Sequence, residues 1–175
     1  ESYLNGGDVD SAVRVLEAGG WHVTIPPKSL CCGRPLYDWG MLDRADALLR
    51  ELLDALEPAL ARGTPVIGLE PACLAAFRDE VPALFPDDER AGRLKDQSFL
   101  LSEFVAEHAL ETDRPLHHRK ALIQVHCHEH ALAKPEAEKK VLQQLGIDAE
   151  IMPNGCCGMA GSFGFEAAKY PVSVK

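Results

Sequence analysis

The chain has 175 residues, of which 46% are hydrophobic and 26% are charged. This composition is typical of a soluble globular protein, either one domain or two small halves, and it excludes a disordered chain. The 18 basic and 27 acidic side chains leave a net charge of −9. Because that charge repels phosphate backbones and anionic lipids, we expect no nucleic-acid partner.

No segment has the ~20 uninterrupted apolar residues that a membrane span requires. The leucine-rich stretch at 47–61 carries Arg50, Glu51, Asp54 and Glu57. The chain begins with Glu1, and its start lacks the basic and then apolar pattern of a signal peptide. We therefore expect a cytoplasmic protein, or one held at the inner face of the membrane by a partner. We interpret the chain as a piece of a longer protein.

The first sixty residues predict a helix, a strand and a second helix. Residues 8–19 have a helical pattern that ends at a pair of glycines, and residues 21–26 (WHVTIP) read as a short strand stopped by prolines. Leucines at helical spacing predict a long amphipathic helix from about Leu42. Pro58 lies in its last turns, where we expect a kink or an early end.

The next part alternates in the same way. Residues 64–69 (TPVIGL) predict a buried strand, and Glu70 precedes a helix over 72–77, for which it is a candidate N-cap. A charged segment over 85–96 then leads to another helix around 100–110.

The remaining residues predict a linker, two strands and a broken helix. The polar stretch 111–120 is the linker, residues 121–125 and 149–153 are the strands, and the helix over 129–146 is interrupted at Pro135. Strands that alternate with helices indicate an α/β fold with mainly parallel strands. We divide the chain into a first half over 1–110 and a second, truncated half over 121–175.

An internal repeat supports this division. VLEAGGWHVTIPPKSLCCG at 15–33 matches VLQQLGIDAEIMPNGCCG at 141–158, and both run from a helix end through Gly, a strand and Pro to Cys-Cys-Gly. The spacing from Leu16 to Cys31 is 15 positions and that from Leu142 to Cys156 is 14. We infer two pseudo-equivalent halves with a CCG turn in each. The same offsets would place a leading cysteine near residue 1 and a trailing one beyond Lys175, so we expect the scheme to be cut at both ends.

The adjacent cysteines favour a polynuclear metal centre. Neighbouring side chains diverge and do not easily serve one tetrahedral zinc ion, and the usual Cys-x2-4-Cys spacing of zinc sites is absent. Two adjacent sulfurs can instead reach different metal atoms of an iron–sulfur cluster. Gly33 and Gly158, which follow the two pairs, would let backbone amides approach the cofactor. A structural zinc module without a redox role and a thiol–disulfide enzyme remain open as alternatives.

Four motifs resemble the cysteine-rich CCG domain family: CCGRPLYDWG, GLEPAC, VHCHEHAL and GCCGMAGSFGFE. That family includes the cysteine-rich subunit of heterodisulfide reductase and the iron–sulfur subunits of glycolate oxidase, lactate-utilisation and anaerobic glycerol-3-phosphate dehydrogenase systems. The chain is most similar to the C-terminal part of large FAD-linked oxidases that act on D-2-hydroxyacids such as glycolate and D-lactate.

The resemblance implies a 4Fe–4S or non-cubane cluster, and it implies which residues ligate it. The metal ligands would be Cys31, Cys32 and Cys73 in the first half, and Cys127, Cys156 and Cys157 in the second. Many members have Cys-x-x-Cys where this chain has Cys73 and Ala76, so one ligand of the family pattern is lost. The implied activity is electron transfer from a flavin, with FAD and the flavin domain outside this chain and an unidentified electron acceptor. We assign no catalytic residue to the chain and expect it to be inactive alone.

Several other residues have a structural interpretation beside a functional one. His126, His128 and His130 flank Cys127 at alternate positions, and we expect at most one or two of them to face it, as ligands or as neighbours of ligands. Arg34 and Tyr37 would line an electron-entry surface or pack. His117 and His118 are expected to be solvated, and the GMAGSFG run is not taken as a nucleotide-binding turn.

The topology makes one geometric prediction about the cysteines. The strand over 64–69 should place Cys73 in the first turn of its helix, close to Cys31 and Cys32, with sulfur separations of about 4–7 Å. Both CCG turns should lie at the carboxyl ends of strands, namely those over 21–26 and 149–153.

Overall fold

The computed structural model describes residues 6–108, 116, 119–153 and 157–175. The first half begins with helix α1 (Gly6–Ala18), α2 (Arg34–Asp38) and the long α3 (Leu42–Leu60). Strand β1 (Val66–Gly68) leads into α4 (Pro71–Ala75), a π-helical turn over Ala76–Glu80, and α5 (Val81–Leu84). Helix α6 (Glu89–Gln97), strand β2 (Ser98–Leu100) and α7 (Leu101–His108) complete this half.

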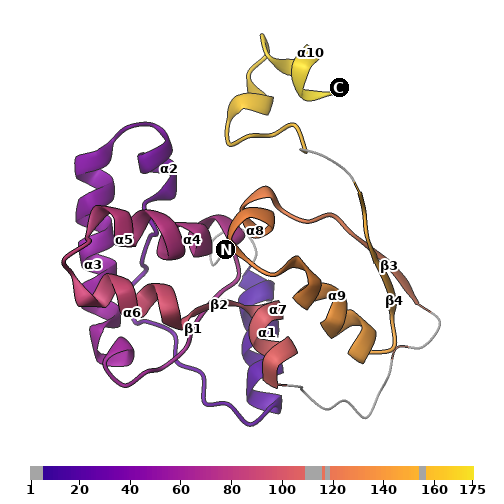
Figure 1. The fold of residues 1–175 in the computed structure, drawn as a ribbon, viewed down its shortest axis with the longest axis horizontal. Coiled ribbons are helices and arrows are strands. Elements are labelled where there is room, and N and C mark those ends of the chain that lie inside the picture. Colours follow the sequence, from indigo (N-terminus) through magenta and orange to yellow (C-terminus); the bar gives the residue numbers. More distant parts are fainter. Residues whose placement is uncertain (1–5, 109–115, 117–118, 154–156) are drawn as a thin grey trace.

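The second half repeats the alternation on a smaller scale. Strand β3 (Lys120–Ile123) is followed by α8 (Cys127–Leu132), α9 (Pro135–Gln144) and strand β4 (Asp148–Ile151). A 3-10 turn over Phe163–Phe165 and the short α10 (Tyr170–Ser173) form the C-terminal segment. The segment stands clear of the other elements in Figure 1, where it is yellow.

Each half contains one parallel pair of strands, as the alternation of strands and helices predicts. β1 pairs with β2, with Ile67 opposite Phe99, and β3 pairs with β4, with Leu122 opposite Glu150. Figure 1 shows β3 and β4 beside α9 on the right, away from β1 and β2 near the centre. The α/β class and the two pseudo-equivalent halves are therefore confirmed.

The repeat is visible in the backbone where α1 and α9 end. Trp21 N donates to Leu16 O at 3.1 Å, and Ile147 N donates to Leu142 O at 3.0 Å. Gly20 and Gly146 have φ values of 86° and 79°, and their amides donate at 2.9 Å to Glu17 O and Gln143 O. This pair of bonds is the Schellman arrangement, in which a left-handed glycine closes a helix. Both halves thus turn from helix into extended chain in the same way.

The two halves differ immediately after this turn, and here the predicted strand over 21–26 is wrong. Residues 21–26 form no strand, whereas the equivalent β4 pairs with β3. A strand needs a hydrogen-bonded neighbour, and no described segment pairs with 21–26. Trp21 instead packs edge-on against Phe104 and His108, with ring centroids 5.0 Å from each. The first CCG turn therefore does not follow a strand.

The charged segment over 85–96 contains most of helix α6, which its composition does not predict. Asp88 caps α6 by accepting a hydrogen bond from Arg90 N at 3.0 Å, and Ala91 and Leu94 bury the inner face of the helix. Strand β2 is not predicted from the sequence, because three residues are too few for a period to be recognised. Helix α3 ends at Leu60, two residues after Pro58. The break at Pro135 lies between α8 and α9, as predicted.

The core of the first half lies between α3, α6 and the continuous helical stretch from α4 to α5. Five of its larger side chains are each at most 2% exposed: Leu49, Leu53, Leu60, Val81 and Leu94. Cys32 belongs to the same cluster, and Cys73 packs against it. The core thus brings the CCG turn and α4 together.

Candidate metal centre

Cys32 and Cys73 lie in direct contact, although 41 residues separate them. Their Sγ atoms are 2.9 Å apart, closer than the expected 4–7 Å. Cys73 is the third residue of α4, and Glu70 caps that helix by accepting a hydrogen bond from Ala72 N at 3.2 Å. Cys32 is buried and Cys73 is half-buried. The predicted convergence of these two cysteines is confirmed, and so is the capping role of Glu70.

The contact lowers the pKa of one thiol and raises the pKa of the other. The hydrogen bond from Cys73 lowers the pKa of Cys32 to about 7, against the opposing effect of burial, with help from backbone amides and the charge of Arg34. The pKa of Cys73 is raised, first by its hydrogen bond to Cys32 and then by burial. Near neutral pH Cys73 therefore keeps its proton, and about half of the Cys32 side chains are thiolates.

Cys31 lies beside this pair at the surface. It is exposed, its Sγ accepts a hydrogen bond from Gly33 N at 3.5 Å, and its charge contributes to the raised pKa of Cys73. Gly33 has a φ of 70°, and a Cβ there would lie 3.3 Å from Ala45 O. The glycine thus allows both the turn and its close approach to α3, as the CCG motif requires.

Ion pairs fix the helix that comes after this turn. Arg34 pairs with Asp38 at 2.9 Å and with Glu80, which is at the end of the π-helical turn. Because Glu80 and Cys73 belong to one continuous helical stretch, the pair holds α2 against the element that carries Cys73. Arg34 therefore makes two ion pairs, and its side chain is half-buried. Glu80 is not among the residues predicted from the sequence, since nothing distinguishes it from the other acidic residues nearby.

The second half contributes a cluster around Cys127. Three residues, His126, Cys127 and His128, offer one ligand atom each. These atoms lie within 4.8 Å of one another. The two imidazoles stack with centroids 5.1 Å apart, while His130 lies outside the cluster. Two of the three histidines therefore face Cys127, in agreement with the expectation of one or two.

This cluster forms where the chain turns into α8. His126 caps the helix, with Nδ1 accepting a hydrogen bond from His128 N at 3.2 Å. Glu129 accepts in return from the backbone amide of His126, which is the reciprocal pattern of a capping box. His126 is extended, with φ −66° and ψ 143°, and Cys127 begins the helix. This change of backbone direction lets three consecutive side chains converge.

His128 faces the first half. Burial lowers its pKa, and the charges of Arg34 and His126 lower it further, while Glu80 and Asp38 act in the opposite direction. Its Nδ1 is buried without a hydrogen-bond partner. Helix α8 packs against α4, so this cluster and Cys73 lie on neighbouring helices (Figure 1).

The second CCG turn is described only in part. Cys156 lies outside the described residues, as do His117 and His118, and Cys157 is exposed. Gly158 has a φ of 82°, and a Cβ there would overlap Ser173 O. Ser173 Oγ donates to Gly158 O at 2.8 Å. The glycine is therefore required by packing against α10, and a role in cofactor binding stays a prediction, as it does for Gly33.

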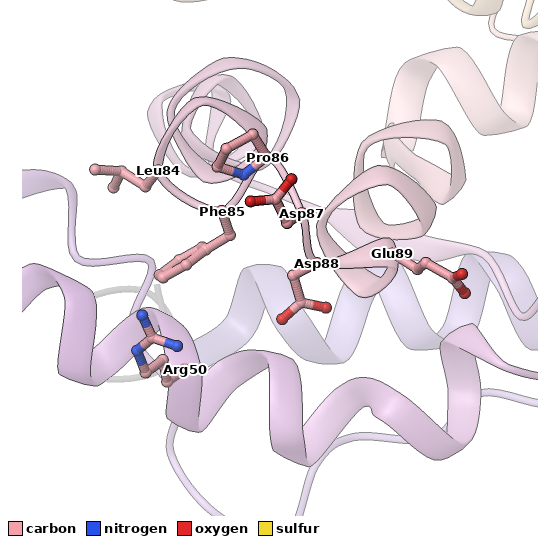
Figure 2. Close-up of a pocket in the computed structure, with 7 residues that line it drawn as sticks. All are labelled: Arg50, Leu84, Phe85, Pro86, Asp87, Asp88 and Glu89. Carbon is pink, nitrogen blue, oxygen red and sulfur yellow. The ribbon is translucent and has the colours of Figure 1, made fainter.

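A pocket of about 590 Å³ lies elsewhere, lined by Arg50 and residues 84–89. Figure 2 shows these side chains. Arg50 lies over the ring of Phe85, 4.7 Å from its centroid, and Asp88 caps α6 and pairs with Arg90 at 2.7 Å. Three of its charged side chains form ion pairs with residues outside the pocket: Arg50 with Asp46, Asp88 with Arg90 and Glu89 with Arg93. No cysteine or histidine lines it.

Comparison with known proteins agrees with the cysteine pattern. The cysteine-rich domain family CCG matches residues 5–78 and 121–171. Lactate utilization protein A of Bacillus velezensis is 30% identical over 168 residues, which cover 91% of this chain and 68% of that protein. The protein of the same name from Bacillus subtilis is 27% identical over 168 residues, with the same coverage.

A third relative is longer. It is one of the subunits of the anaerobic glycerol-3-phosphate dehydrogenase of Escherichia coli, and it is 28% identical over 167 residues, which cover 92% of this chain and 41% of that relative. The chain therefore spans less than half the length of the Escherichia coli relative. No solved structure matches the chain.

Proposed function

Because the chain belongs to the cysteine-rich CCG domain family, we propose that it is the iron–sulfur electron-transfer domain of an FAD-linked oxidoreductase. In this proposal the whole enzyme oxidises a small 2-hydroxyacid, and the domain relays electrons from the flavin to an acceptor. The names of its relatives, a lactate utilization protein and part of a dehydrogenase, support an oxidoreductase. The 2-hydroxyacid and the flavin rest on the resemblance of the CCG motifs.

The contact between Cys32 and Cys73 is the observation that carries the proposal. Two sulfurs from distant segments meet at 2.9 Å beside a third, exposed cysteine. Thiolates are the usual protein ligands of iron–sulfur clusters. The lowered pKa of Cys32 favours the thiolate that ligation requires. The donor set therefore fits an iron–sulfur group.

The residues have distinct parts in this function. Cys31, Cys32 and Cys73 would hold the group in the first half, and Cys127, Cys156 and Cys157 would hold it in the second. When bound, such a cluster accepts and releases single electrons. The amide of Gly33, which already donates to Cys31 Sγ, would stabilise negative charge on that sulfur. The charge of Arg34 acts in the same direction on Cys32.

The partner in this proposal is a flavin domain in the same chain or complex, with FAD outside the 175 residues. None of the helices in the described part of the chain is long and apolar enough to cross a membrane. We place the domain in the cytoplasm, or at the inner face of the membrane through a partner. The electron acceptor is left unassigned.

Anaerobic reconstitution with iron and sulfide tests the proposal. The chain and its Cys32→Ser and Cys73→Ser variants are compared for bound iron, acid-labile sulfide and visible absorption. Ala72→Ser is the matched control, since it adds the same hydroxyl at a half-buried position of the same helix. We expect iron and sulfide in the wild-type chain and the control, and a loss of both in each cysteine variant.

Two results would contradict the proposal. One is a folded chain that takes up no iron and sulfide without oxygen, both alone and as part of its full-length protein. The other is stoichiometric zinc in place of iron, which would favour the structural zinc module instead.

A further inference from the structure

The cluster at His126, Cys127 and His128 places two imidazoles beside a thiol. A metal centre held by cysteines alone would not require these imidazoles. The three donor atoms of the cluster lie within 4.8 Å of one another. His126 and Cys127 are exposed, so solvent metal can reach them. His128 is half-buried, and its buried Nδ1 has no hydrogen-bond partner. An imidazole nitrogen without a partner beside a thiol is a suitable arrangement for a transition-metal ion.

We propose that His126, Cys127 and His128 form a mixed nitrogen and sulfur site for one divalent transition-metal ion, such as Zn²⁺ or Fe²⁺. The inference rests on the proposed function in taking Cys127 as a metal ligand, but it assigns Cys127 to a single ion in place of the cluster shared with Cys156 and Cys157. It adds that imidazoles, and not thiolates alone, bind metal in the second half. Three donors leave one position of a tetrahedral ion for a further ligand.

The geometry requires a small adjustment. Bonds of about 2.0–2.1 Å to nitrogen and 2.3 Å to sulfur place tetrahedral ligands roughly 3.3–3.6 Å apart. The donors, now within 4.8 Å, must therefore move closer by up to about 1.5 Å. Rotation of the exposed His126 and Cys127 side chains can supply this movement without a change in the core. The change of backbone direction at His126 is what makes adjacent residues able to share one ion.

Metal binding would compete with helix capping. Nδ1 of His126 accepts a hydrogen bond from His128 N. A neutral imidazole that ligates through one nitrogen carries its proton on the other. His126 therefore cannot bind metal through either nitrogen and still accept this bond. An asparagine at 126 would keep the cap and lose the imidazole, so that helix stability and metal affinity can be separated.

The test is a titration of the wild-type chain with Zn²⁺ under reducing, oxygen-free conditions, observed through ¹⁵N-labelled histidines. The His126→Asn, His128→Gln and His130→Asn variants assign the resonances. With saturating Zn²⁺, we expect the imidazole nitrogens of His126 and His128 to shift and those of His130 to stay. His130 is the matched control, because it lies on the same helix outside the cluster.

A titration with Co²⁺ measures the Kd of the site. Visible absorption of Co²⁺ is followed in a Cys32→Ser, Cys73→Ser background, which removes the principal competing thiols. We expect the Kd to rise by at least about tenfold in His126→Asn and His128→Gln, and to stay unchanged in His130→Asn. If the background variant does not fold, the wild-type ¹⁵N titration decides alone.

The outcomes separate this inference from the proposed function. Unmoved His126 and His128 resonances at saturating Zn²⁺, or a Kd that neither variant changes, would overturn the site. Iron and sulfide held through Cys32 and Cys73 would then still support the electron-transfer function. Conversely, Zn²⁺ on the two imidazoles in a chain that takes up no iron and sulfide would keep this site and remove that function.

Discussion

Arg78 and Glu103 form a buried ion pair that joins the two halves. Arg78 Nη2 lies 2.7 Å from Glu103 Oε2, and the carboxylate side chain is 2% exposed. Arg78 also donates to Ser98 O at 2.8 Å and to Leu132 O at 2.8 Å, while Glu103 accepts from Lys134 N at 3.1 Å. The pair therefore connects the π-helical turn and α7 of the first half to the end of α8 in the second.

Replacing Arg78 by methionine should destabilise the chain by about 3–5 kcal/mol, because it leaves a buried carboxylate without its partner. Burial opposes ionisation of Glu103, but hydrogen bonds from Arg78 and from backbone amides outweigh it and lower the pKa. A lowered pKa contributes stability above the ordinary value of 4.5, and that stability is lost as the pH falls through the folded-state value. The decrease in the free energy of unfolding caused by Arg78→Met should therefore be larger near neutral pH than in acid.

Urea unfolding followed by circular dichroism at the two pH values measures this effect. Arg93→Met is the control, since Arg93 pairs with Glu57 and Glu89 at the surface and its loss should cost about 0–1 kcal/mol. Equal losses in the two variants would show that the buried pair does not hold the halves together.

Cys73→Ala should raise the pKa of Cys32 from about 7 toward its ordinary value of 9.0. The hydrogen bond from Cys73 is the largest cause of the lowered value, and alanine has no proton to donate. The measurement is the ultraviolet absorbance of the thiolate in the reduced, metal-free chain, taken as a difference from the matching Cys32→Ser variant. Cys127→Ala should leave the titration of Cys32 where it is. A titration that Cys73→Ala does not move would contradict the assigned proton.

Gly33→Ala should destabilise the chain by about 1–2 kcal/mol, since a left-handed residue with a Cβ is unfavourable. The added methyl would also crowd Ala45 O. Gly92→Ala is the opposite control, because Gly92 lies within α6 with open space around it and should gain about 0.5–1 kcal/mol. Thermal unfolding of both variants gives the comparison, and a stabilised Gly33→Ala would refute the packing role of this glycine.

Glu129→Gln should raise the Tm near neutral pH and leave it almost unchanged near pH 4. Burial raises the pKa of Glu129, and the charges of Glu138 and Glu103 raise it further. A raised carboxyl pKa gives stability that is complete below the ordinary value of 4.5 and lost as the pH rises through the folded-state value. Glutamine removes this loss and can still accept the hydrogen bond from His126 N.

Scanning calorimetry across this pH range provides the measurement. Glu136→Gln on the exposed face of α9 is the control and should change little. A Glu129→Gln variant that is less stable than wild type near neutral pH would show that the carboxylate is stabilising there.

Local signals determined several features of this protein without any tertiary structure. The glycines at 20 and 146 end their helices through matching hydrogen bonds, because a left-handed closure depends on a residue without a Cβ and on its immediate neighbours. The cap at Glu70 and the break at Pro135 are local for the same reason. The sequence also predicts that Cys73 lies near Cys32, at about 4–7 Å, but the direct contact at 2.9 Å depends on the tertiary packing.

Only the tertiary structure decided the features that depend on a partner from elsewhere in the chain. Residues 21–26 have the same local pattern as β4 but form no strand, because a strand exists only where a neighbour accepts its hydrogen bonds. The partner of Arg78 is 25 residues away, and periodicity cannot identify it. His126 and His128 converge on Cys127 because the backbone changes from extended to helical between them, and the alternating sequence pattern does not identify which of the three histidines face the cysteine.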